Sequence, residues 1–134
     1  MSAHASKSKI RRGLAPAVRR EVAVMWIAHS AGGGGWVSIV AHRYKSNHLM
    51  VRARTRDHIL SMWPCAEVYT LDVPHDYQYR ADILREDVAE ALSVYAENIE
   101  YDDYKSTISD SDLYEALVEI WTVLAQKFGR GPQY

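Results

Sequence analysis

The sequence predicts one α+β domain, in which an antiparallel sheet of about five strands is followed by two C-terminal helices. A length of 134 residues fits a single domain, expected over residues 22–130. Short β-patterned runs separated by turn residues fill residues 22–83. After them, residues 85–98 and 112–128 carry apolar side chains at helical spacing. Residues 1–21 are expected to be a basic N-terminal extension.

Three strands are expected in the first half of the domain. Residues 22–29 and 36–43 are β-patterned and are joined by Gly32–Gly35, which predicts a hairpin with a glycine-rich tip. The glycines lack the Lys-Ser/Thr ending of a phosphate-binding loop, so a plain turn is expected. Residues 48–54 form the third strand, and the short loop before them makes it an antiparallel neighbour of the second.

A short helix separates these strands from the last two. Thr55 is a suitable N-cap and Pro64 ends a helical pattern, which together predict a helix over residues 55–63. Residues 67–72 and 76–83 alternate in the manner of a fourth and a fifth strand. The predicted order of the sheet is a simple β-meander.

Two amphipathic helices close the chain, joined by the polar loop 100–111. The stripe of the first comprises Val88, Leu92, Tyr95 and Ile99. Asp112 and Glu115 form a plausible capping box for the second, and Gly129 stops it. Its expected buried face comprises Leu113, Leu117, Ile120, Trp121, Leu124 and Phe128.

Charge is unevenly distributed along the chain. Residues 1–24 contain six Lys or Arg against one acid, and residues 25–134 contain ten against sixteen. A basic head can bind nucleic acid or simply be an extension that binds nothing, and both interpretations stay open. The acidic body argues against a general duplex-DNA binder, because phosphate contacts dominate that affinity.

Several classes of protein and site are disfavoured. The longest apolar stretch, residues 22–28, is too short for a membrane span, and no secretory signal is expected. The single cysteine, Cys65, is expected to be a buried thiol in a reducing cytoplasm, and no metal or cofactor site is expected. The six histidines show no zinc-binding spacing, and no nucleophile elbow or Walker loop occurs, so binding is favoured over catalysis.

The third strand predicts an anion site. Arg52, Arg54 and Arg56 recur at period two along the third strand and just past its end. Arg80 lies on the fifth strand, and alternation is expected to place it on one face of the sheet and Tyr77 on the other. The second strand ends with His42 and Arg43. Arginine suits bidentate phosphate recognition. The alternative is a solvated sheet face whose arginines form salt bridges with the acids of the body.

The loop after the first C-terminal helix is the second candidate. Its aromatic, acidic and basic side chains are Tyr101, Asp102, Asp103, Tyr104 and Lys105. Aromatic rings stack on bases, and acids accept hydrogen bonds from ribose hydroxyls or exocyclic amines. The alternative is a helix–helix turn whose tyrosines cover the core. Beside an arginine cluster, the loop favours a nucleotide pocket.

A series of short motifs carries a family resemblance. They are Met25-Trp26, Ser38–Arg43, Val51–Arg54, Asp76–Arg80, Arg85–Leu92, Ile99–Lys105 and Tyr114–Trp121. In order and spacing this series resembles the first-described type of phage anti-Thoeris sponge, over about residues 25–128. The resemblance implies a sheet with two C-terminal helices, a cytoplasmic homodimer or hexamer, and no enzymatic activity.

The resemblance also implies a ligand. Members of the family sequester cyclic ADP-ribose isomers made by TIR-domain immune enzymes, and some hold cyclic di- or trinucleotides at separate sites. By motif, Arg52, Arg54 and Arg80 would meet the pyrophosphate, and residues 101–105 would meet base and ribose. Asp103 and Tyr104 depart from the usual Asn and Phe, which puts the identity of the ligand in doubt more than the fold.

Two other classes of function remain open. Exposed aromatic residues such as Trp36, Tyr44 and Tyr134 would suit a protein–protein inhibitor or adaptor. A small enzyme that hydrolyses a nucleotide signal is the third hypothesis, and slow consumption of the ligand would distinguish it from a sponge.

Overall fold

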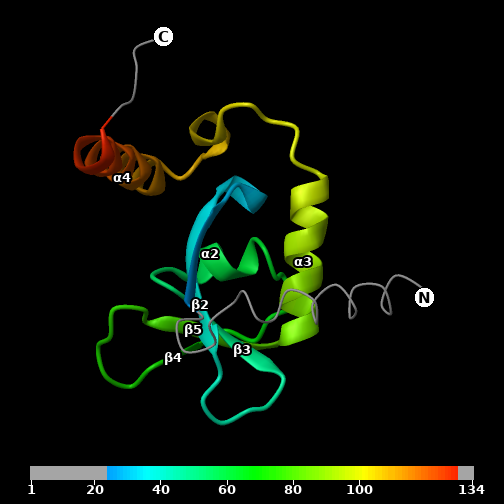
Figure 1. The fold of residues 1–134 in the computed structure, drawn as a ribbon. Helices are drawn as coiled ribbons and strands as arrows, with labels where there is room; N and C mark the ends of the chain where they lie inside the picture. The colour runs from blue at the N-terminus through cyan, green and yellow to red at the C-terminus, as the bar shows by residue number, and fades with distance from the viewer. Residues whose placement is uncertain (1–23, 130–134) are drawn as a thin grey trace.

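The computed structural model describes residues 24–129, and the expected extension 1–21 lies outside them. An antiparallel five-stranded sheet is flanked by helices, as predicted (Figure 1). The strands are β1 (Val24–His29), β2 (Gly35–Ala41), β3 (His48–Ala53), β4 (Tyr69–Thr70) and β5 (Tyr79–Leu84). The helices are α2 (Arg56–Leu60), α3 (Arg85–Glu97) and α4 (Ser111–Phe128), with 3-10 turns η3 (Ala31–Gly33) and η4 (Tyr104–Thr107).

The strand order is not the predicted meander. The order is β1-β2-β3-β5-β4, so β5 pairs with β3 and the two-residue β4 forms the edge. Instead of extending β4, the chain turns back through hydrogen bonds to Gln78, whose side chain donates to the Leu71 carbonyl at 2.6 Å and accepts from the His75 amide at 3.0 Å. These bonds replace ladder pairing, which is why β5 begins only at Tyr79.

One face of the sheet forms the core with α2 and α3. Val37, Val51 and Ala81 have no exposed surface, and they pack with Ile59 and Val88. The side chain of Thr55 accepts from the His58 amide and caps α2, as predicted, although the helix ends at Leu60. A further turn continues to Trp63, which packs into the core, whereas Cys65 is exposed rather than buried as expected.

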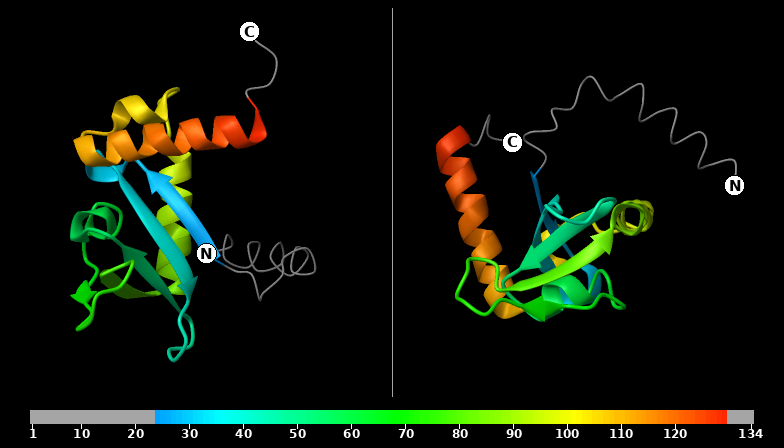
Figure 2. Two further views of the ribbon diagram at one scale, coloured as in Figure 1. Left: turned by 90° about the vertical axis from the view of Figure 1, so that its left-hand side faces the viewer. Right: turned by 90° about the horizontal axis from the view of Figure 1, so that it is seen from below.

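The two C-terminal helices are both present and differ in how they pack. α3 begins directly after β5, where the Arg85 amide donates to the Asn47 carbonyl at 2.7 Å. Seen from below, α3 and α4 lie on opposite sides of the sheet (Figure 2). Within residues 24–129, no helix is both long and apolar enough to cross a membrane.

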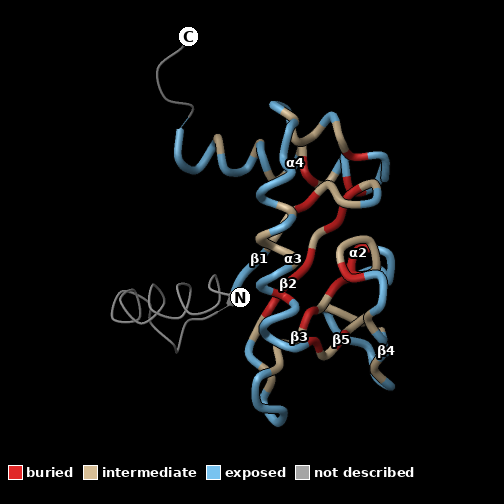
Figure 3. The backbone as a smooth tube through the Cα atoms, turned by 90° about the vertical axis from the view of Figure 1, so that its right-hand side faces the viewer, coloured by how far each residue is buried: buried red, intermediate tan, exposed pale blue. Residues whose placement is uncertain are grey.

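α4 is less buried than its sequence predicts. Only Leu113 and Leu117 are buried, in a small second cluster with Ile108, while Trp121, Leu124 and Phe128 are exposed (Figure 3). Ile120 is partly buried against this cluster, so the expected buried face was wrong only at Trp121, Leu124 and Phe128, where α4 extends past the sheet. The N-cap is also shifted, since Asp110 rather than Asp112 accepts from the Leu113 amide, at 3.1 Å.

Candidate functional site

Three of the predicted arginines gather on the sheet face that α2 and α3 leave uncovered. Arg52 lies between the buried residues Val51 and Ala53, so alternation directs its side chain to the opposite face. Arg52 and Arg80 are direct cross-strand partners. Arg54 follows at the end of β3. We call Arg52, Arg54 and Arg80 the arginine row.

Tyr77 holds this row together. The guanidinium carbons of Arg52 and Arg54 lie 4.9 Å and 4.6 Å from the centre of its ring, and Arg80 Nε donates to its carbonyl at 3.1 Å. Contacts of this kind stabilise arginines that would otherwise repel one another. The expected placement of Tyr77 on the face opposite Arg80 was wrong, because Tyr77 precedes β5 and does not follow its alternation.

No acid neutralises the arginine row in the part of the chain that the structure describes. The ion pairs among residues 24–129 join Asp82 to His42 and Lys45, and Asp110 to His58. Arg52 donates to Ser38 Oγ at 2.6 Å, but its buried Nε has no hydrogen-bond partner among the described residues. Burial and the nearby charge of Arg80 lower the pKa of Arg52. A buried donor without a partner is costly unless an acceptor such as an anion binds it.

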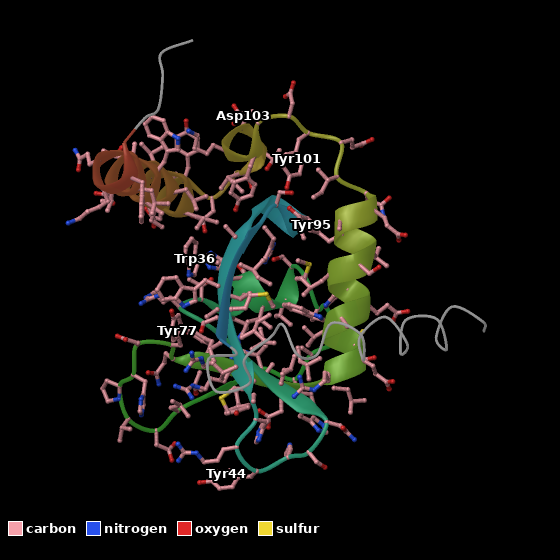
Figure 4. All side chains as sticks on the ribbon, in the orientation of Figure 1. Trp36, Tyr44, Tyr77, Tyr95, Tyr101 and Asp103 are labelled. Carbon is pink, nitrogen blue, oxygen red and sulfur yellow. The ribbon has the colours of Figure 1, made fainter. Side chains whose placement is uncertain are left out.

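An aromatic cleft of about 480 Å³ adjoins the row. Trp26 and Trp36 lie across β1 and β2 with ring centres 6.0 Å apart, and together with Tyr77 and Arg54 they line the cleft. Trp36 and Tyr77 lie on the same side of the sheet (Figure 4). The N-cap and first three turns of α4 form the opposite wall, where Asp110 and Asp112 contribute carboxylates and Leu113 an apolar surface.

His58 fixes this wall to the sheet. Its Nδ1 accepts from the Trp36 amide at 3.3 Å, so its Nε2 carries the proton that points to Asp110 Oδ2, 3.5 Å away. The His58 carbonyl accepts from His29 Nε2 at 3.1 Å. The two histidines thereby connect β1, β2, α2 and the start of α4. None of this was anticipated from the sequence, because the contacting residues are 22 to 52 positions apart.

The predicted loop 101–105 lies apart from the arginine row. Tyr101 bonds to Tyr95 through their hydroxyls at 2.7 Å, and the Tyr104 hydroxyl donates to the His29 carbonyl at 2.9 Å. Tyr95 and Tyr101 lie near the C-terminal end of α3 (Figure 4). Burial and the neighbouring tyrosines raise the pKa of Tyr104. None of residues 101–105 lines the aromatic cleft.

The charged groups of this loop serve local structure. The Asp103 side chain caps η4 by accepting from the Lys105 amide at 3.2 Å, while Asp102 is exposed. Lys105 Nζ lies 4.9 Å from the centre of the Trp121 ring on α4. Tyr104 packs against the same small cluster as Trp36. The loop therefore supports α4, behind the wall of the cleft.

His42 and Arg43 are not part of this arrangement either. His42 lies at the other end of β2, where its Nε2 is 3.2 Å from Asp82, and Arg43 is exposed in the following turn. Although burial raises the pKa of Asp82, hydrogen bonds from Lys45, Tyr69 and His42 lower it overall. Among residues 24–129, no three His, Cys, Asp or Glu side chains gather as metal ligands would.

Comparisons with known proteins give no relative. No family model, no curated protein and no solved structure matches the chain.

Proposed function

We propose that this chain is a phage anti-defence protein that binds and sequesters a cyclic nucleotide immune signal, such as a cyclic ADP-ribose isomer, without degrading it. The observation that carries the proposal is the arginine row, which has no acid partner among the described residues and opens beside an aromatic cleft. Guanidiniums and aromatic rings side by side match the two chemical parts of a nucleotide.

The cleft suggests how the ligand would lie. The pyrophosphate would contact Arg54, which lines the cleft, and Arg52 and Arg80, which continue the arginine row beside it. The base would stack on Trp26 or Trp36, and Asp112 would accept from a ribose hydroxyl. A volume of about 480 Å³ falls within the range of small-molecule sites. A sponge needs affinity and copy number rather than turnover, so no nucleophile or general base is required.

The proposal includes a homodimer, with a hexamer as a larger assembly. Trp121, Leu124 and Phe128 are 53%, 52% and 83% exposed on one helix, and an exposed apolar surface of this kind is typical of an interface. Residues 101–105 do not line the cleft of their own chain. If this loop contacts the ligand, it would therefore contact the ligand bound in the cleft of the partner subunit. The site of action would be the host cytoplasm.

Calorimetry on the purified protein tests the proposal. We expect a cyclic ADP-ribose isomer to bind, linear ADP-ribose to bind more weakly because its ends must be ordered, and the ligand to be recovered unchanged after denaturation. Recovery of a hydrolysed product would indicate an enzyme instead. No heat with any cyclic nucleotide would contradict the proposal.

The exposed surface of α4 also favours a second candidate, a protein–protein inhibitor. The same five-turn helix would then cover a groove on a host protein, with Trp121 and Phe128 as anchors. A tight complex with a host protein, formed without any nucleotide, would distinguish this function from the sponge.

A further inference from the structure

A second depression lies on the other side of the sheet. It is a groove of about 750 Å³ between α3 and the segment that follows α2. Trp63, Ala91 and Val94 supply apolar surface, and Cys65 lines it as well. Its free carboxylates are Glu67, Asp87 and Glu90, and we call it the acidic groove. Asp82 lies at its edge, but its carboxylate pairs with His42 and Lys45 on the other side of the sheet.

The acidic groove is short of positive charge. No lysine or arginine lines it, and Glu67, Asp87 and Glu90 form no ion pair with any described residue. Three unpaired carboxylates around an apolar floor attract a segment that combines cations with aliphatic side chains. The groove is therefore complementary in charge and polarity to a basic amphipathic peptide.

We propose that the groove is occupied by the chain's own N-terminal segment, residues 7–20. This segment has six cations and no acid, and it carries Ile10, Leu14 and Val18 among them. The charges match the three free carboxylates, and the aliphatic side chains match the floor. The inference does not rest on the proposed function, since the groove and the arginine row belong to opposite faces of the sheet.

The reach of the chain supports this occupant. Val24 opens β1 in register with Val40, Met50 and Asp82, so its backbone lies three strand spacings, or about 14 Å, from the Asp82 backbone at the edge of the groove. His48 and Leu84 line the groove at this same end of the sheet. At about 3.3 Å per residue, five residues span that distance, so Arg19 and Arg20 reach the near end and residues 7–12 the far end.

Tethering makes a modest attraction sufficient. A segment joined to its site by a few residues has an effective concentration in the millimolar range, so a binding constant too weak for two separate molecules still fills the site. Solvent-exposed ion pairs each contribute about 0.2–1 kcal/mol and are screened by salt. Occupancy is therefore expected to fall as salt is added.

Cys65 provides the test, because it is the only cysteine of the chain and lines the groove. The rate of alkylation by iodoacetamide, an uncharged reagent, is measured on the full chain and on a variant with Lys7, Lys9, Arg11, Arg12, Arg19 and Arg20 all changed to Gln. We expect the native chain to react about three- to tenfold more slowly, as for a groove covered 70–90% of the time. Addition of 0.5 M NaCl should remove most of the difference.

Groove variants complete the design. In a Glu67→Gln, Glu90→Gln groove variant, the native segment should no longer protect Cys65. The alkylation rate of this variant with the native segment is compared with that of the same variant with the Gln segment, and the two rates should be equal. Glu115→Gln with Glu119→Gln, two exposed acids on α4, is the matched control and should keep it. Equal alkylation rates for the native and Gln segments would overturn the proposal. Protection that grows with protein concentration would overturn it too, because the segment would then come from another copy.

Discussion

At the scale of single residues, the unusual feature is a half-buried arginine, Arg52, whose buried Nε donor is unused. One guanidinium nitrogen of Arg52 donates to Ser38 and the group stacks on the Tyr77 ring, but its Nε has no hydrogen-bond partner among the described residues. Folding leaves such a group unsatisfied only at a cost, which a bound anion would recover. Arg52 is therefore the residue on which the proposed binding of a pyrophosphate depends most.

Removal of Arg52 should weaken binding strongly. We expect Arg52→Ala to lose on the order of 2–5 kcal/mol of binding free energy for a cyclic ADP-ribose isomer, the usual cost of truncating one partner of a buried charge pair. Calorimetry measures it. Arg43→Ala is the matched control, because Arg43 is exposed at the far end of β2 and should bind as the native chain does. Equal losses in both variants would contradict the assignment.

A second residue-scale prediction concerns His29. Burial lowers the pKa of His29 below 6.5, and its Nδ1 has no acceptor in the described part of the chain. Below pH 6.5, His29 is therefore protonated in the unfolded chain but stays neutral in the folded chain until the pH is lower. The free energy of unfolding consequently falls as pH falls. The slope from this group is at most about 1.4 kcal/mol per pH unit.

Urea unfolding at pH 7.5 and 5.5 checks this sign. His29→Gln keeps a side-chain amide that can donate to the His58 carbonyl but does not titrate, so the loss of stability on acidification should shrink. An unchanged pH dependence in His29→Gln would assign the effect to other groups.

Sequence alternation could predict part of the residue-scale picture. The period-two spacing correctly places Arg52 on one face and Val51 on the other. Tyr77 was misplaced, because the bonds of Gln78 to the turn before it delay the start of β5. The His29–His58–Asp110 contacts depend on the tertiary fold, and no local pattern reports them.

At the scale of elements, the wall of the aromatic cleft depends on how α4 begins. Asp110 caps the helix and also faces His58, and the Leu113 amide, as the largest cause, lowers the pKa of this carboxyl. The sequence predicted the helix, but it placed the cap at Asp112. Both aspartates suit an N-cap by residue type, and the contact with His58 distinguishes them only in the folded chain.

Asp110→Ala should destabilise the fold by about 1 kcal/mol through the lost cap. Asp110→Asn should lose less, because Asn caps nearly as well. Asp112→Ala is the control, since Asp112 is exposed in the first turn and caps nothing. Urea unfolding compares the three variants. Equal stability of Asp110→Ala and Asp112→Ala would show that Asp110 does not cap α4.

The glycine turn between β1 and β2 positions the same wall. Gly34 has φ +110°, and a Cβ built on it would lie 2.6 Å from Ile108 Cδ1 and 3.1 Å from Leu113 Cδ2. Gly129 has φ +79° and open space around it. Gly34→Ala should therefore cost about 1–3 kcal/mol more than Gly129→Ala in unfolding experiments, because both are strained but only the first overpacks a cluster. Equal costs would show that the turn can move away from α4.

The elements themselves were largely predictable, and their ends were not. Helical periodicity predicted α3 and α4, and the glycine run predicted the first hairpin. The position of β5 between β3 and β4 is a long-range pairing, which the sequence of neither strand specifies. The exposure of Trp121, Leu124 and Phe128 depends on where the sheet ends, and no helical pattern contains that information.

At the scale of the whole molecule, the two sides of the sheet carry different sites. The uncovered face carries the arginine row and the aromatic cleft, and the helical side carries the acidic groove. The sequence shows only that a basic head precedes an acidic body. The fold gathers Arg52, Arg54 and Arg80 on one side and Glu67, Asp87 and Glu90 on the other, so one small chain offers an anion site and, on the other side, a site for its own basic segment.

The most direct test of the central claim is native mass spectrometry on protein expressed together with an active TIR-domain enzyme, followed by heat release and chromatography of the bound fraction. We expect a dimer or hexamer that releases an intact cyclic ADP-ribose isomer, and Arg52→Ala protein that releases none. An oligomer that emerges empty under these conditions would contradict the account.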